Sequence, residues 1–274
     1  MNAIIIDGKN PIGESIALYL IQDGYKVSYY THEEALHKKN LHKLEDQDLV
    51  VNLFYYSIFY SSLTNIDFLQ GALSNVLEHI DTLPKKPSTF VTMSSIAVYN
   101  DHSINTEFNI QYKNDYISKS LLAIEETMSA LDSDDFRVIV MRLPVVAYKD
   151  SIFSSIMNMK KMRFYSNQLN AKNFLTWVSL KDLQRAFVFL LKDKKQNGVF
   201  NVVSTKFTNI VQLNLYLRAK YGRSFFRLPS FVFAWMIRNN SYLFDSYKVQ
   251  PKRLLDSGFE FEDKDLDVCL DKIV

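Results

Sequence analysis

The chain has 274 residues, and its 47% hydrophobic, 23% charged composition is that of a globular protein, which excludes a largely disordered one. Its 32 basic and 30 acidic residues leave a net charge of only +2, which gives no electrostatic basis for binding nucleic acid or an anionic membrane. No stretch of 18 or more apolar residues occurs without charge, so we expect no membrane span.

The first half of the chain alternates short β-branched or aromatic runs with longer amphipathic stretches. In chain order these predict a strand at 3–6, a helix at 11–22, strands at 26–31 and 49–54, a helix at 66–80, a strand at 89–94, a helix at 115–131 and a strand at 137–142. Strands joined by helices imply right-handed crossovers and a parallel sheet. The near-continuous apolar character of the strands agrees with burial of both faces of this sheet.

After Pro144 the alternation becomes less regular. The pattern predicts a strand at 174–178, a helix at 180–191, a strand at 199–203, a helix at 208–221 closed by Gly222, and a mostly helical remainder. We therefore expect a sheet domain over 1–205 and a smaller, mostly helical C-terminal lobe over 206–274. The apolar stretch 228–236 is too short to cross a bilayer, so it packs in the core, lines a cavity or forms a subunit contact.

Several motifs carry a resemblance to a known group of proteins. They are the turn after the first strand, MSSIAVYN at 93–100, MRLPVVAY at 141–148, TWVSLKDL at 176–183 and GVFNVV at 198–203. Together they resemble the extended short-chain dehydrogenase/reductase superfamily, which includes NAD-dependent sugar epimerases and dehydratases. The tail at 246–270 is similar to the C-terminal module of its atypical, epimerase-like branch. The resemblance implies an α/β fold with a Rossmann-like doubly wound parallel sheet.

In that superfamily the first strand–helix turn carries Gly-x-x-Gly-x-x-Gly, which lets a pyrophosphate approach the backbone at a helix N-terminus. Aligned on its last glycine, this chain has Asp7, Asn10 and Gly13 at the three positions. Asn10 tolerates a left-handed conformation, whereas the Asp7 carboxylate would repel a pyrophosphate unless it caps the helix. The turn is either a weakened or altered dinucleotide site or a plain turn that binds nothing. Its candidate cofactor residues are Asp7, Gly8, Asn10, Pro11, Ile12 and Gly13.

The ends of the second and third strands supply the other cofactor candidates. His32 stands where a basic residue would suit the phosphate of NADP, which weakly favours NADP over NAD, and it is equally consistent with a solvated loop histidine. After the third strand the superfamily has small residues, but this chain has Leu53, Phe54 and Tyr55. The two rings either fill the adenosine–ribose channel or turn into the core.

The resemblance also implies a catalytic group. In the superfamily a Ser or Thr holds the substrate hydroxyl, and a Tyr acts as general acid/base with a Lys four residues later. Ser95 and Lys119 match, but the aligned tyrosine position is Asp115, and Tyr116 precedes Lys119 by three residues. A spacing of three keeps both side chains on one helix face. Ser95, Tyr116 and Lys119 are either a working triad or a strand-end hydrogen-bonding residue, a packing residue and a solvated lysine.

Other chemistry has little support. The histidines have no metal-ligand spacing, so we expect no metal site. The apolar run 3–6 is too short for a signal peptide, and Cys269 has no partner for an internal disulfide, so we expect a reducing, cytoplasmic location. The sequence thus predicts an NAD(P)-binding, epimerase-like oxidoreductase acting on a small molecule such as a nucleotide-sugar, either monomeric or as a homo-oligomer. The alternative is a non-catalytic descendant that binds a nucleotide or a protein.

Overall fold

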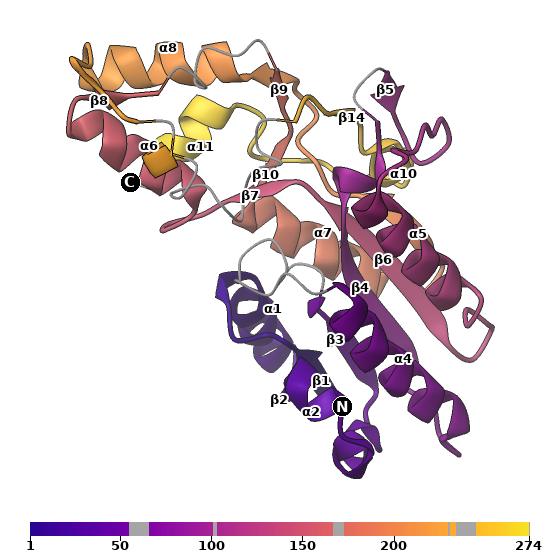
Figure 1. Ribbon diagram of the computed structural model, residues 1–274. Coiled ribbons are helices and arrows are strands. Elements are labelled where there is room, and N and C mark those ends of the chain that lie inside the picture. The colour runs from indigo at the N-terminus through magenta and orange to yellow at the C-terminus, as the bar shows by residue number, and fades with distance from the viewer. Residues whose placement is uncertain (55–65, 101–102, 167–172, 230, 234–244, 274) are drawn as a thin grey trace. The chain divides into compact units, whose positions relative to one another are not determined.

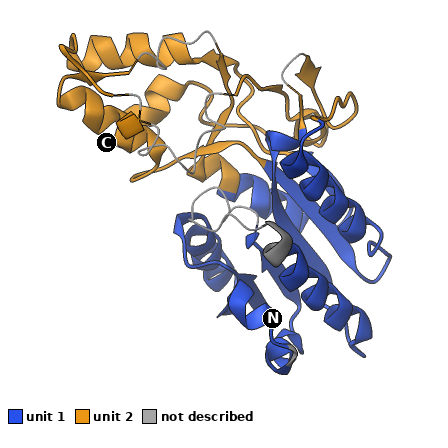
Figure 2. Ribbon diagram, viewed as in Figure 1, with its two compact units in different colours: residues 1–98, 114–142, 184–200 blue, residues 99–113, 143–183, 201–274 orange. Residues whose placement is uncertain are grey.

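The computed structural model describes residues 1–54, 66–100, 103–166, 173–229, 231–233 and 245–273 (Figure 1). The chain forms two compact units (Figure 2): unit 1 contains 1–98, 114–142 and 184–200, and unit 2 contains 99–113, 143–183 and 201–274. Each unit is therefore built from separated segments, whereas the sequence predicts a single boundary after residue 205. The difference arises because strands before and after that boundary pair with each other in unit 2.

Unit 1 is organised around a six-stranded sheet with the order β11-β6-β4-β3-β1-β2. Its strands are β1 (Asn2–Ile6), β2 (Lys26–Tyr30), β3 (Leu49–Asn52), β4 (Thr89–Ser95), β6 (Arg137–Leu143) and β11 (Gly198–Asn201). β1 pairs in parallel with β2 and β3, and β3 with β4. Every residue of β3 and β4 is buried, as expected for parallel strands covered on both faces. The predicted α/β, Rossmann-like sheet is confirmed.

Helices cover both faces of this sheet. The main ones are α1 (Pro11–Gln22), α4 (Ile66–Thr82), α5 (Tyr116–Ser129) and α7 (Leu180–Lys192), with a short α2 (His32–Ala35) and the 3-10 helices η1 (Lys38–Leu44) and η2 (Ile96–Val98). α4 and α5 lie side by side on one face (Figure 1). On the other face the Gln184 amide of α7 donates a hydrogen bond to the Ser15 carbonyl of α1 at 3.1 Å.

The strand order defines where a ligand would bind. After β1 the chain moves to β2 on one side, and then to β3 and β4 on the other. In open α/β sheets, ligands bind at the carboxyl ends of the strands at such a reversal. The register pairs Ile6 with both Tyr30 and Asn52, so the residues after β1, β2 and β3 begin at the same level. This edge of unit 1 is called the carboxyl edge below.

Unit 2 combines helices with short strand pairs. Its described helices include α6 (Ile152–Lys161), α8 (Ile210–Tyr221), α10 (Lys252–Asp256) and α11 (Leu266–Lys272). Its strand pairs are β10 (Trp177–Ser179) with β7 (Val145–Ala147), β12 (Thr208–Asn209) with β9 (Phe174–Leu175), β13 (Phe226–Arg227) with β8 (Phe164–Tyr165), and β14 (Lys248–Val249) with β5 (Ile104–Asn105). α6, α8 and α11 pack around a buried apolar cluster that contains Trp177.

The elements of unit 2 differ in part from those that the sequence predicts. The single strand expected at 174–178 is two short strands separated by Thr176, and neither β7 nor α6 was predicted. α8 begins at Ile210 rather than at Thr208 because Asn209 caps it, and it ends at Gly222, whose φ of +77° suits glycine. The predicted apolar stretch 228–236 lies partly outside the described residues. Within the described part of the chain, none of the helices combines the length and the apolar character that a membrane crossing requires.

Candidate functional site

The turn between β1 and α1 is organised by the side chain of Asn10. Its Oδ1 atom accepts hydrogen bonds from the backbone N–H groups of Ile12 at 3.1 Å and Gly13 at 3.0 Å. Its Nδ2 atom donates to the Asp7 carbonyl at 2.7 Å. Pro11, at the first helical position, has no N–H to offer. Two amides of the helix N-terminus therefore converge on one oxygen atom, which is how such a terminus also holds an anion.

The backbone conformation of this turn differs from the expectation. Asn10 has φ −148° and ψ 165°, an extended conformation that any residue adopts. The left-handed residue is Asp7, with φ +55°. The Asp7 N–H still continues the strand ladder, since it donates to the Tyr30 carbonyl at 2.8 Å, and the chain turns away from β1 at this residue. The replacement that needs backbone tolerance is thus Asp7, and Asn10 serves as the helix cap.

Close contacts at Gly8 and Gly13 explain why the turn keeps these two glycines. A Cβ atom on Gly13 would lie 2.2 Å from the Gly8 carbonyl oxygen, and one on Gly8 would lie 2.4 Å from Cγ2 of Ile5. Both distances are far below van der Waals contact, so α1 can start this close to β1 only with glycine at these positions. Gly13 therefore brings the helix N-terminus to the carboxyl edge.

Asp7 and His32 form a buried pair at this edge. Asp7 Oδ1 accepts a hydrogen bond from the His32 N–H at 3.0 Å, and Asp7 Oδ2 lies 2.8 Å from His32 Nδ1. Both side chains are less than a tenth exposed, and His32 Nε2 lies 3.0 Å from Glu33 Oε1. Burial raises the pKa of Asp7, and the charge and hydrogen bonds of His32 offset part of that rise. His32 is therefore not a solvated loop residue, and Asp7 does not cap α1.

Phe54 and Leu53 follow β3 at the same edge. Both are completely buried, and the Phe54 N–H donates to Asn52 Oδ1 at 3.1 Å. The edge of the Phe54 ring meets the His32 ring, with centroids 6.2 Å apart and planes at 85°. This buried position agrees with the alternative in which the Phe54 ring turns into the core. Tyr55 lies outside the described residues.

The candidate catalytic residues lie where β4 ends and α5 begins. Ser95 is buried, and its Oγ accepts the N–H of Ala97 at 3.1 Å, so its own proton can be donated to a ligand. Tyr116 opens α5 and is 58% exposed, and Lys119, one turn later, is also exposed. Asp115, at the position aligned with the superfamily's tyrosine, caps this helix by accepting the Ser118 N–H at 2.8 Å.

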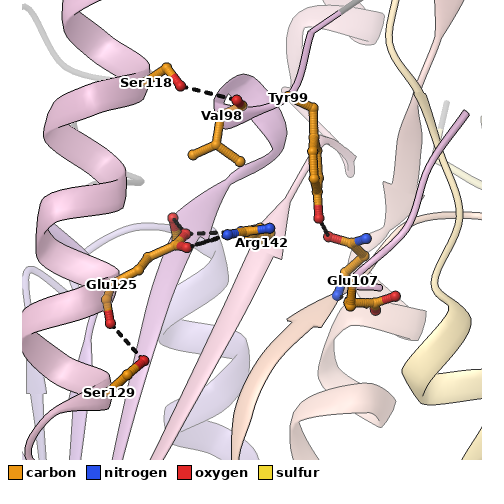
Figure 3. A network of polar contacts seen from close by, with 9 residues as sticks. Val98, Tyr99, Glu107, Ser118, Glu125, Ser129 and Arg142 are labelled. Carbon is orange, nitrogen blue, oxygen red and sulfur yellow. Dashed lines mark hydrogen bonds and ion pairs between the residues drawn. The ribbon is translucent and has the colours of Figure 1, made fainter. Parts of the chain in front are cut away.

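Ser118 connects the two elements. Its Oγ donates to the Val98 carbonyl at 3.0 Å, and Figure 3 shows the side chain pointing from α5 to that oxygen. This bond fixes the first turn of α5 beside the segment that follows Ser95. The structure thus brings Ser95 and the first turn of α5 into one region of unit 1, with Tyr116 and Lys119 on the exposed side of that turn.

The sequence analysis missed a buried ion pair in this region. Glu125 on α5 and Arg142 at the end of β6 face each other (Figure 3), with Nη2 and Oε2 2.5 Å apart, and Arg142 Nε lies 3.1 Å from both carboxylate oxygens. Ser94, next to Ser95, donates to Glu125 Oε1 at 2.5 Å. The pair therefore joins α5, β4 and β6 at the residue that precedes Ser95. An arginine inside the apolar run RVIVMRL was the signal for it.

The described residues fit the diphosphate of a dinucleotide at a cost. A phosphate oxygen would have to replace Asn10 Oδ1 on the Ile12 and Gly13 amides, and an Asn cap is worth only about 1 kcal/mol. Micromolar binding corresponds to about −8.2 kcal/mol, so displacement of the cap lowers affinity without abolishing it. The Asp7 carboxylate would repel a phosphate, although both of its oxygen atoms are engaged by the N–H and the ring of His32.

Comparison with known proteins places this geometry in context. No family model matches the chain. It is 21% identical to the epimerase family protein SSP1921 of Staphylococcus saprophyticus, over 99% of this chain and 98% of that protein. The crystal structure of human epimerase family protein SDR39U1 with NADPH has a TM-score of 0.78 and 19% identity, covering 100% of this chain and 99% of that one.

A third similar protein is an enzyme of known substrate. UDP-glucose 4-epimerase of Thermotoga maritima, solved with UDP-glucose, has a TM-score of 0.76 and 14% identity, covering 99% of this chain and 98% of that one. These likenesses run over essentially the whole chain and confirm the resemblance predicted from the sequence. The chain has the fold of the NAD-dependent epimerase/dehydratase proteins, the extended short-chain dehydrogenase/reductase superfamily.

Proposed function

We propose that this chain is an NAD(P)-binding, epimerase-like oxidoreductase whose cofactor site is the carboxyl edge of unit 1. The observation that carries the proposal is the convergence of the Ile12 and Gly13 amides on one oxygen at the reversal of strand order. A helix N-terminus that gathers two N–H groups on an oxygen atom is suited to a phosphate, and this is where dinucleotide folds place it.

The residues of unit 1 have distinct roles in this proposal. The Ile12 and Gly13 amides would hold the diphosphate, and the bound nicotinamide would supply or accept hydride. Ser95 would orient a substrate hydroxyl through the proton it can donate. Tyr116 would exchange a proton with that hydroxyl, and the Lys119 ammonium one turn later would favour the phenolate form of Tyr116.

The choice between NAD and NADP is left to measurement. Any positive charge of His32 is offset by Asp7 and Glu33, so the buried pair gives no preference for the additional phosphate of NADP. The substrate class proposed is a small hydroxylated molecule such as a nucleotide-sugar. It is supported by the likeness to an epimerase solved with UDP-glucose.

The test is calorimetric titration of the full chain with NADPH, NADP+, NADH and NAD+, together with the thermal shift each ligand causes. We expect one redox pair to bind and to raise the melting temperature. Asn10→Asp should weaken binding strongly because it puts a negative charge where the phosphate oxygen would lie. Asn209→Asp, at the cap of α8 in unit 2, is the matched control and should leave affinity unchanged. No binding of any of the four at millimolar concentration refutes the proposal.

One observation favours a second candidate, a non-catalytic binding protein. Asp115 has become the cap of α5 at the position aligned with the catalytic tyrosine. The two candidates differ in turnover. If the cofactor binds, NADPH oxidation and NAD+ reduction are followed with a panel of nucleotide-sugars and simple carbonyl compounds. Turnover that Tyr116→Phe abolishes supports the enzyme, whereas cofactor binding without turnover across the panel supports the binding protein.

A further inference from the structure

We propose that Asn10 is a resident ligand of the phosphate cradle, whose side chain has to leave α1 before a diphosphate binds and so sets the affinity of the site. This inference rests on the proposed function, because it concerns the same cradle. It goes further by naming the residue that limits binding and by predicting a variant that binds more tightly than the natural chain.

The carboxamide of Asn10 is held at both ends. Oδ1 receives the Ile12 and Gly13 amides, and Nδ2 donates to the Asp7 carbonyl at 2.7 Å. With Pro11 lacking an N–H, these are the amides that the start of α1 offers on this side. A phosphate oxygen and Asn10 Oδ1 would therefore compete for the same two donors.

The left-handed conformation of Asp7 completes this closed arrangement. Asp7 has a φ of +55°, and its carbonyl oxygen accepts the hydrogen bond from Asn10 Nδ2. The Asp7 carboxylate is held by His32. The two replaced glycine positions are thus bonded to each other. When Asn10 leaves the helix, Nδ2 also gives up its bond to Asp7, so opening of the cradle breaks three hydrogen bonds of one side chain.

Charge gives this competition a clear chemical signature. Asn10 is neutral, and the turn 7–13 carries the single cation Lys9 against the single anion Asp7. A diphosphate therefore gains little from the charge of the turn itself and depends on the two amides. Removal of the Asn10 side chain should strengthen binding of phosphate-bearing ligands and leave binding of an uncharged nucleoside unchanged.

The experiment compares the full-length chain with Asn10→Gly, Asn10→Asp and the control Asn209→Gly, which removes an equivalent cap from α8. NADPH, ADP, inorganic pyrophosphate and adenosine are titrated by calorimetry, and the amide resonances of Ile12 and Gly13 are followed by NMR. Because exchange of an Asn cap for Gly changes helix stability by a few tenths of a kcal/mol, we expect Asn10→Gly to bind NADPH, ADP and pyrophosphate about twofold more tightly. Asn10→Asp should bind them more weakly, and Asn209→Gly should match the natural chain.

The outcomes separate this inference from the proposed function. Binding of NADPH by the natural chain without any gain in Asn10→Gly overturns the inference and leaves the proposed function standing. Binding by Asn10→Gly alone supports the inference and overturns cofactor use by the natural chain. Failure of both to bind NADPH and pyrophosphate overturns both, since removal of the side chain alone should open the cradle. An equal gain with adenosine also overturns the inference, because the effect would not involve phosphate.

Discussion

Arg142→Met should lower the free energy of unfolding by about 3 to 5 kcal/mol, because it leaves the Glu125 carboxylate as an unpaired charge in the core. The side chains of Arg142 and Glu125 are 2% and 5% exposed. Arg142 Nε lies 3.1 Å from both carboxylate oxygens, and Nη2 lies 2.5 Å from one of them. Methionine keeps the apolar stem of the arginine and removes only the charge and the donors.

The size of this loss in stability comes from the desolvation of the Glu125 carboxylate rather than from its attraction to Arg142. A buried pair is often no more stabilising than apolar residues of the same volume, and the large loss comes from the single charge left behind. Since domains are stable by only about 5 to 15 kcal/mol, the single variant should lose a large part of the total. The double variant Glu125→Leu with Arg142→Met removes both charges and should recover most of that loss.

Urea unfolding followed by circular dichroism at neutral pH measures these changes. The control is Lys252→Met, which breaks an exposed pair with Asp256 whose side chains are about half exposed and should cost no more than about 0.5 kcal/mol. A loss below about 1 kcal/mol in Arg142→Met, or a double variant as unstable as the single one, would refute the reasoning.

Three further predictions test the candidate site and its surroundings. Gly13→Ala should lower the urea midpoint of unfolding sharply, because the new Cβ would lie 2.2 Å from the Gly8 carbonyl oxygen. In the control Gly71→Ala the new Cβ has nothing within 4 Å, so the midpoint should stay unchanged or rise, and equal effects of the two variants would contradict the close approach at Gly13. Burial raises the pKa of Asp7, so its contribution to folding is fully present below its unfolded value of about 3.9 and is lost as the pH rises through its folded value. Asp7→Asn should therefore flatten the dependence of the free energy of unfolding on pH over that acid range, and an unchanged slope would contradict a raised pKa of Asp7. Burial also raises the pKa of Cys269 to about 12, so its thiol should react with a disulfide reagent at pH 8 only after unfolding, as the absorbance of the released thiolate reports.

The parallel sheet of unit 1 was predictable because its central strands are buried on both faces. β3 and β4 are β-branched and aromatic runs that are buried at every residue, and such runs between amphipathic helices have few other interpretations. The split of 174–178 was not predictable, because Phe174–Leu175 pairs with β12 while Trp177–Ser179 pairs with β7. That division depends on partners distant in the sequence, which a local pattern does not contain.

The candidate site was predictable in position but not in detail. Alignment on Gly13 located the turn, the resemblance of MSSIAVYN to the superfamily motif located Ser95, and the amphipathic pattern located the start of α5. The partner of Asp7 is His32, 25 residues away, and local reasoning had no means of finding it. Similarly, the sequence indicated that Asn10 tolerates a left-handed backbone, but the residue that adopts it is Asp7, whose N–H donates to the Tyr30 carbonyl of β2.

The strand pairs of unit 2 have a consequence for how this chain can be divided and how it can evolve. β5, β8 and β9 precede residue 205, and their respective partners β14, β13 and β12 follow it. A truncation after residue 205 would remove the partners of β5, β8 and β9 at once, and β12, β13 and β14 in the excised tail would lose theirs. The tail is therefore not an independent module that recombination can move between proteins, and its sequence has to evolve together with the segments with which it pairs.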